Sequence, residues 1–104
     1  MLEKYKELNK IYENYVILIV NGKFLETFNK DAIVVNRLVG YKLMIYRKYV
    51  KLGFSIDFKN RVLIELEKNN INYIVYYNSI VDKVKFKYNM YKKYYMDFIN
   101  MVEN

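Results

Sequence analysis

The stretch YVILIVNGKFLETF, residues 15–28, decides the fold. Its first six residues, 15–20, are apolar without a break, which is typical of a central strand that is covered on both faces. Asn21-Gly22 follows, and this pair favours the two positive-φ positions of a type I′ turn. The sequence therefore predicts a tight hairpin whose second strand runs antiparallel to the first and ends at Phe28.

A large aromatic residue, Phe24, comes directly after this turn and two residues before a carboxylate, Glu26. Side chains alternate between the faces of a strand, so Phe24, Glu26 and Phe28 share one face and Leu25 lies on the other. Alternation alone does not say which face is buried. Either Phe24 folds back into the core, where phenylalanine is more often found, or it is presented to something outside the protein and Leu25 belongs to the core.

The composition bounds the function. The chain has 104 residues, of which 54% are hydrophobic and 18% aromatic, so we expect one domain over residues 1–104 with a single core. It contains neither cysteine nor histidine. Disulfides, thiolate metal sites and nucleophile systems that need histidine or cysteine are therefore excluded. The formal net charge of +7 favours polyanionic partners.

The N-terminus, MLEKYKELNK, is charged throughout and does not resemble a signal peptide. The longest apolar run, residues 15–20, is far shorter than the roughly 20 residues needed to span a bilayer. We expect a soluble, cytoplasmic protein.

Helical and extended patterns alternate along the chain in the order α-β-β-α-β-β-α-β-β-α. This order predicts an α/β fold of the α+β-like kind, with a mixed sheet of about six strands and helices packed on it. The predicted helices cover residues 2–12, 29–39, 58–68 and 89–102, and the predicted strands cover residues 15–20, 23–28, 41–46, 49–54, 72–77 and 83–88.

The second helix depends on its end signals, because the β-branched run at residues 33–35 favours a strand. Asn29 is a good N-cap, Asp31 suits the first helical turn, and Gly40 suits the position that closes a helix. Ser55 or Asp57 is expected to cap the third helix.

With this order established, the chain resembles the N-terminal mismatch-recognition domain of the MutS family, over about residues 2–88. That family has a G-x-F-x-E hairpin, an acidic start to the next helix, a leucine and glycine at its end, and a later Gly-Phe before a helix. The matching residues are Gly22, Phe24, Glu26, Phe28, Asp31, Ala32, Leu38, Gly40, Gly53 and Phe54.

The resemblance implies that Phe24 enters the DNA minor groove and stacks on a mispaired base, and that Glu26 hydrogen-bonds that base. Three positions depart from the family pattern: Val20, Lys23 and Leu25. Lys23 adds positive charge beside Phe24, where it could attract the DNA backbone.

Two further basic stretches are ambiguous. Arg47 and Lys48 lie in the predicted turn between residues 41–46 and 49–54, and we count them as DNA-binding candidates. Lysines and aromatic residues also alternate over residues 83–95. That segment could bind phosphates and single-stranded bases, but we favour an edge strand with its lysines in water.

The sequence thus predicts a non-catalytic nucleic-acid-binding protein that needs no cofactor or metal. Its three glycines exclude a Walker A loop within these residues, so we expect it to assist a larger machine, such as a MutS-type ATPase, a polymerase or a reverse transcriptase. The alternative is a protein-interaction module that kept the fold and lost DNA binding, with exposed tyrosines as anchors.

Overall fold

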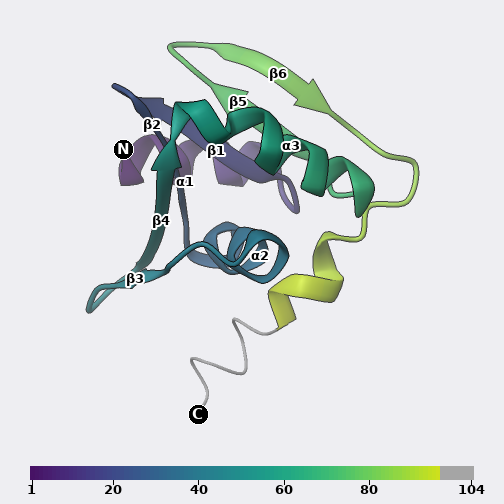
Figure 1. Cartoon of the computed structure of the whole chain (residues 1–104), viewed down its shortest axis with the longest axis horizontal. Helices are drawn as coiled ribbons and strands as arrows, with labels where there is room; N and C mark the ends of the chain where they lie inside the picture. The colour runs from purple at the N-terminus through teal and green to yellow at the C-terminus, as the bar shows by residue number, and fades with distance from the viewer. Residues whose placement is uncertain (97–104) are drawn as a thin grey trace.

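The computed structural model describes residues 1–96, and its strands and helices follow the predicted order (Figure 1). The elements are α1 (Leu2–Ile11), β1 (Val16–Asn21), β2 (Phe24–Phe28), α2 (Asn29–Val39), β3 (Met44–Ile45), β4 (Val50–Ser55), the 3₁₀ turn η1 (Ile56–Phe58), α3 (Lys59–Lys68), β5 (Tyr73–Tyr76) and β6 (Ile80–Val84), followed by helical residues 91–96. The predicted fold class, a mixed sheet of about six strands with helices packed on it, is confirmed.

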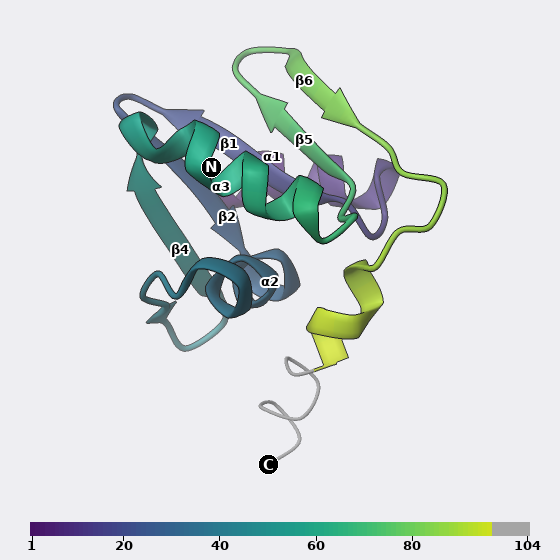
Figure 2. The same cartoon turned by 45° about the vertical axis from the view of Figure 1, so that its right-hand side comes forward.

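The six strands form one sheet in the order β3-β4-β2-β1-β5-β6. Only β1 and β5 pair in parallel, with Val16 opposite Tyr73, and every other neighbouring pair is antiparallel. Helix α1 lies behind the sheet in Figures 1 and 2, whereas α2 and α3 lie in front of it. Strand β1 is therefore covered on both faces, as its unbroken apolar sequence predicts.

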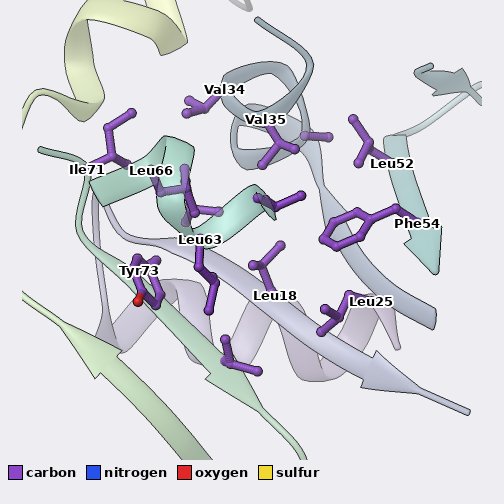
Figure 3. Packing of buried hydrophobic residues seen from close by; sticks show 14 of the residues in the cluster. Leu18, Leu25, Val34, Val35, Leu52, Phe54, Leu63, Leu66, Ile71 and Tyr73 are labelled. Atoms are coloured by element: carbon purple, nitrogen blue, oxygen red, sulfur yellow. The ribbon is translucent and has the colours of Figure 1, made fainter. Parts of the chain in front are cut away.

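The alternation along β1 divides the core in two. Val16 and Leu18 pack with α2, α3 and the neighbouring strands, and Figure 3 shows Leu18 and Leu25 on this side. Ile17 and Ile19 pack with residues of α1 on the other side. All four side chains of β1 named here are at most 1% exposed. The central strand is thus fixed from both faces by apolar burial, the dominant favourable term in folding.

The hairpin exists, but its turn lies one residue later than predicted. Asn21 is the last residue of β1 and pairs with Phe24, so Gly22 and Lys23 form the turn. Gly22 has a φ of 62°, while Asn21 stays extended. Glycine at the first central position is the arrangement of a type II′ turn. The type I′ prediction was wrong because Asn21 remains in the ladder, where its amide donates to Glu26 at 3.1 Å.

The second helix is confirmed, and Gly40 ends it with a left-handed φ of 76°. Asn29 is not its N-cap. Phe28 occupies that position, while Asn29 has a φ of 50° and its Oδ1 accepts a hydrogen bond from the Val50 backbone N–H at 3.1 Å. Asn29 thus joins the end of β2 to the start of β4. The cap predicted for the third helix lies one turn earlier: the Ser55 hydroxyl oxygen accepts from the Asp57 N–H at 3.2 Å and caps η1, whereas Phe58 precedes α3 and gives it no side-chain cap.

Two predicted strands are misplaced. The strand expected at residues 41–46 is only Met44–Ile45, and the one expected at residues 83–88 is β6, Ile80–Val84. Beyond β6 the chain leaves the ladder because asparagine side chains replace strand partners. Asn72 Oδ1 accepts from the Phe86 N–H at 2.7 Å, and Asn89 Oδ1 accepts from the Asn72 N–H at 3.1 Å.

The final helix is present at residues 91–96, and the rest of its predicted range lies outside the described residues. Within residues 1–96, none of the helices has the length and apolar character that crossing a bilayer requires.

Candidate nucleic-acid interface

Phe24 projects from the first position after the β1–β2 turn. Its side chain is 55% exposed, whereas the next residue, Leu25, is fully buried in the core. The alternation predicted from the sequence is therefore confirmed: one residue anchors the strand and its neighbour faces outward.

The backbone around Phe24 is held on both sides. Phe24 lies opposite Asn21 on β1 and opposite Ser55 on β4. At the turn itself, the Ile56 N–H donates to the Lys23 carbonyl oxygen at 2.9 Å. The two-residue turn is thus tied to the chain that follows β4. Because the backbone at Phe24 is hydrogen-bonded on both sides and Leu25 is buried in the core, we expect the backbone that carries the Phe24 ring to be rigid.

Glu26 lies on the same face as Phe24 but is only 7% exposed. Its Oε2 is 2.6 Å from Lys51 Nζ, and its Oε1 accepts from Asn21 Nδ2 at 3.1 Å. Hydrogen bonding to this carboxylate raises the pKa of Lys51 above its usual range. Gly53 lies directly opposite Glu26 on β4 and carries no side chain.

Lys51 and Asn21 are the members of this site that the sequence did not identify as partners of Glu26. Lys51 sits two residues from the position opposite Glu26, and only the pairing of β2 with β4 brings it there. That pairing depends on the register of two strands separated by a helix, which a local pattern does not encode. Asn21 was assigned to the turn, and its displacement into β1 places its amide beside the carboxylate.

The five residues predicted for DNA binding fall into two groups. Lys23, Phe24 and Glu26 lie together around the β1–β2 turn, and Lys23 is exposed. Arg47 and Lys48 are exposed at the β3–β4 turn, at the opposite end of β4 (Figures 1 and 2). The five steps of β4 from Val50 to Ser55 separate the two groups by about 17 Å. They do not form a single cluster.

Tyr46 and Tyr49 flank Arg47 and Lys48. Their rings stack with centroids 4.7 Å apart, and the Tyr46 N–H donates to the Tyr49 carbonyl oxygen at 2.9 Å. These contacts close the β3–β4 turn and leave the two cations directed outward. The cations therefore form a small, separate positive surface.

Asp31 lies beneath the interface rather than in it. It is fully buried, and its Oδ2 accepts from the Ile17 N–H at 3.0 Å. Its other oxygen accepts from the hydroxyl of Tyr91, which the sequence did not connect with it. Burial raises the pKa of Asp31 to about 7, against partly compensating hydrogen bonds. Asp31 thus links the central strand to the start of the last helix.

The lysine-rich segment at residues 83–95, which begins in β6, uses part of its charge in contacts within the chain. Lys83 Nζ lies 5.0 Å from the centre of the Tyr12 ring, and Lys87 Nζ lies 5.5 Å from that of Tyr88. Both are cation–π distances.

Residues 1–96 contain no group of three or more acidic, histidine or cysteine side chains placed to hold a metal ion.

The fold and site together define a class: a small domain with a mixed sheet whose central hairpin presents an aromatic side chain. The family model for MutS domain I matches residues 1–57, more than half of the chain. The chain therefore belongs to the MutS domain I family, a family of mismatch-recognition-like DNA-binding domains. The matched range ends just after β4 and includes the whole of the β1–β2 hairpin. None of the curated proteins matches the sequence.

Proposed function

We propose that this chain binds nucleic acid without catalysing a reaction, and inserts Phe24 into the minor groove at mispaired or otherwise weakened base steps. The observation that carries the proposal is the 55% exposure of Phe24 on a turn whose next residue, Leu25, is fully buried. Membership of the MutS domain I family supports the same function.

The free energies of stacking explain why an inserted aromatic ring would select base steps that are already weakened. Unstacking one base step of an intact duplex costs a few kcal/mol. Stacking an aromatic side chain on a base returns about 1–3 kcal/mol. These free energies nearly cancel on a matched duplex. At a mispair the unstacking cost falls, because pairing and stacking are already damaged, and insertion of the Phe24 ring becomes favourable.

The ion pair between Glu26 and Lys51 fits this role. An isolated carboxylate beside the phosphates would be repelled, and Lys51 offsets its charge. A carboxylate has about four lone-pair positions, of which Lys51 and Asn21 occupy two. Glu26 therefore retains unoccupied lone pairs, which a displaced base can reach only at the 7% of the residue that stays exposed. Because the carboxylate is held in a fixed position, a hydrogen bond to it would form only with a base in the right geometry. This bond would therefore contribute to selectivity and not to general affinity for nucleic acid.

The two basic groups would contact the backbone. Lys23 lies beside the inserted ring, and Arg47 and Lys48 lie about 17 Å away along β4. That separation is about half of the 34–36 Å turn of a B-form duplex. One duplex can therefore meet both groups along its length. Each phosphate neutralised adds about 0.9 to the slope of log affinity against log salt.

The proposal is tested by fluorescence anisotropy with matched duplex, G·T-mismatched duplex and single-stranded oligonucleotides, at low and moderate salt. We expect salt-dependent binding with a preference for the mismatched duplex. Phe24→Ala should reduce that preference about fivefold or more, the equivalent of at least 1 kcal/mol of stacking free energy. Phe58→Ala is the matched control, since Phe58 is 46% exposed and lies on η1. Equal preference in wild type and Phe24→Ala would refute insertion.

We further propose that the chain acts as an accessory to a larger machine, either a MutS-type ATPase or a polymerase or reverse transcriptase that meets mispaired heteroduplex. A second candidate is a protein-interaction module. Tyr77 and Tyr88 favour it, because they are 56% and 70% exposed and tyrosine is enriched at binding hot spots. Absence of nucleic-acid binding even at low salt would select this second function.

A further inference from the structure

The outer edge of β4 is open over half of its length. Strand β3 pairs only with Val50 and Lys51, and residues 1–96 place no other strand beside the rest of β4 on that side. The Tyr46 N–H donates to the Tyr49 carbonyl oxygen, so the odd-numbered residues along β4 direct their backbone groups toward the β3 side. Gly53 and Ser55 consequently direct an N–H and a C=O toward the open edge. Such groups are a template for another strand.

An aromatic pocket of about 340 Å³ adjoins this open edge. Tyr41 lines it, with its ring 5.6 Å from that of Phe54 and 6.4 Å from that of Phe58. Tyr41 is held in place because its carbonyl oxygen accepts from Asn36 Nδ2 at 2.7 Å. Phe58 is 46% exposed, so the pocket offers apolar surface to an incoming side chain.

Two cations line the same pocket. Lys42 and Arg61 are both exposed, and neither takes part in an ion pair with another residue of the described chain. Lys59, near Arg61 in sequence, is by contrast paired with Asp82 at 3.0 Å. The edge therefore combines free backbone groups, aromatic surface and uncompensated positive charge.

We propose that the open edge of β4 binds an extended acidic segment of a partner protein, which adds to the sheet as a seventh strand. The backbone of Gly53 and Ser55 supplies the ladder, an apolar side chain of the segment fills the pocket at Tyr41 and Phe58, and flanking carboxylates meet Lys42 and Arg61. This is recognition by β-augmentation, in which backbone bonds give affinity and pockets give specificity.

The charges argue against a second copy of this chain as the occupant. Two β4 edges paired about a twofold axis would bring Lys42 and Arg61 of both copies together, and like charges directly opposite are unfavourable. An acidic segment removes that repulsion. The bound strand would lie two strand spacings, about 10 Å, from β2, which carries Phe24. The inference goes beyond the proposed function and does not depend on nucleic-acid binding.

The probe is a set of eight-residue peptides with a central phenylalanine, valine and threonine around it, and a glutamate at each end. Binding is followed by fluorescence anisotropy and by ¹⁵N NMR of the full chain. We expect saturable binding with the largest shifts at the amides of Gly53 and Ser55, and slower hydrogen exchange there. N-methylation of alternate peptide amides should abolish binding, because it removes the ladder hydrogen bonds. Undiminished binding of the N-methylated peptide would overturn the proposal.

Charge reversal gives the second measurement. Lys42→Glu with Arg61→Glu should weaken binding of the acidic peptide about tenfold or more. Lys85→Glu with Lys87→Glu, just after the strand β6 that forms the opposite edge of the sheet, changes the net charge equally and should leave binding within about twofold. Equal losses in both double variants, shifts confined to β6, or no binding at millimolar peptide would each overturn the proposal. A concentration-dependent dimer that protects the Gly53 amide would overturn it too, by assigning the edge to a second copy.

Discussion

The two hairpins of the sheet differ in how they are supported. The β1–β2 hairpin lies in the middle of the sheet, with β5 beside β1 and β4 beside β2. The β3–β4 hairpin lies at the edge, and both residues of β3, Met44 and Ile45, are exposed. The β1–β2 turn carries the exposed ring of Phe24, and the next residue along β2 is buried in the core. The β3–β4 turn carries two cations, and the stacked rings of Tyr46 and Tyr49 flank them.

This difference in support indicates which kind of nucleic-acid contact each hairpin is suited to make. Pushing a ring between stacked bases requires a backbone that does not yield, and the central hairpin has neighbours on both sides and a core beneath it. Contacts with phosphates tolerate variable geometry, because charge attraction has no strict direction. The edge hairpin can make such contacts without a rigid support. If this contrast holds, the anchorage of the central hairpin should dominate stability and the edge hairpin should act only through its charge.

The largest expected effect is a pH dependence of stability caused by Asp31, which binds the backbone of β1. Its pKa is raised to about 7 in the folded state from an ordinary value of 3.8. Between these pH values the folded state holds a proton that the unfolded state has released. The free energy of unfolding therefore falls as pH rises from about 4 to 7, by up to about 4 kcal/mol.

Urea denaturation of wild type and Asp31→Asn from pH 4 to pH 8 measures this slope. The variant keeps a hydrogen-bonding side chain but cannot titrate, so its slope over this range should be flatter. Asp82→Asn, which removes a half-exposed carboxylate, is the control and should keep the wild-type slope. Parallel curves for wild type and Asp31→Asn would show that Asp31 does not control stability here.

The second largest effect should be a difference between the two hairpins in the cost of removing an apolar side chain. Leu25→Ala deletes a fully buried side chain beneath the Phe24 turn and should cost about 3 kcal/mol of unfolding free energy. Ile45→Ala, at a position that is 69% exposed in β3, should cost less than about 0.5 kcal/mol. Chemical denaturation of both variants provides the comparison. Similar losses would mean that the edge hairpin is as firmly anchored as the central one.

In the β1–β2 turn, replacing Gly22 by alanine should lower the free energy of unfolding. Gly22 has a φ of 62°, so Gly22→Ala should cost about 1–2 kcal/mol although no atom crowds the added carbon. Gly53 has an ordinary φ, and an added Cβ would lie 3.7 Å from the Leu25 carbonyl oxygen, a normal contact. Gly53→Ala should therefore be neutral or stabilising by about 0.4–1 kcal/mol. Thermal melts of the pair distinguish backbone strain from crowding.

The smallest expected effect concerns the edge hairpin in binding. Arg47→Gln with Lys48→Gln should lower the salt slope by at most about 1.8, which is about 0.9 for each phosphate that is no longer neutralised. Affinity should fall equally for matched and mismatched duplexes, so their ratio should not change. Anisotropy titrations over a range of salt concentrations test this. A changed ratio would mean that the edge hairpin takes part in discrimination.

The sequence predicted what depends on neighbouring residues. Residues 15–28 were assigned to the correct hairpin, with Leu25 and Phe24 on opposite faces, because alternation and apolar runs act locally. That Phe24 is the exposed one of the two was implied by the family resemblance and not by the local pattern. The turn register was missed by one residue because the choice between Asn21 and Gly22 depends on the bond from Asn21 to Glu26. The displaced β6 has a similar cause, since asparagine side chains from distant positions end its ladder.

The candidate site was predicted less completely. Lys23, Phe24 and Glu26 came from one short motif, and the structure brings them together. Lys51 reaches Glu26 only through the β2–β4 pairing, and Tyr91 reaches Asp31 across 60 positions of sequence. No periodicity encodes such contacts. The separation of Arg47 and Lys48 from Phe24 likewise follows from the length and direction of β4.

The parallel pairing of β1 with β5 has a consequence for how the chain can be divided. The family match ends at Asp57, yet the strand that covers one side of β1 comes from residues 73–76. A fragment cut after Asp57 would leave β1, whose residues 16–20 are all apolar, with an open edge, a combination that promotes aggregation. We therefore expect a self-supporting fragment that contains the β1–β2 hairpin to extend beyond the matched range, at least through β5.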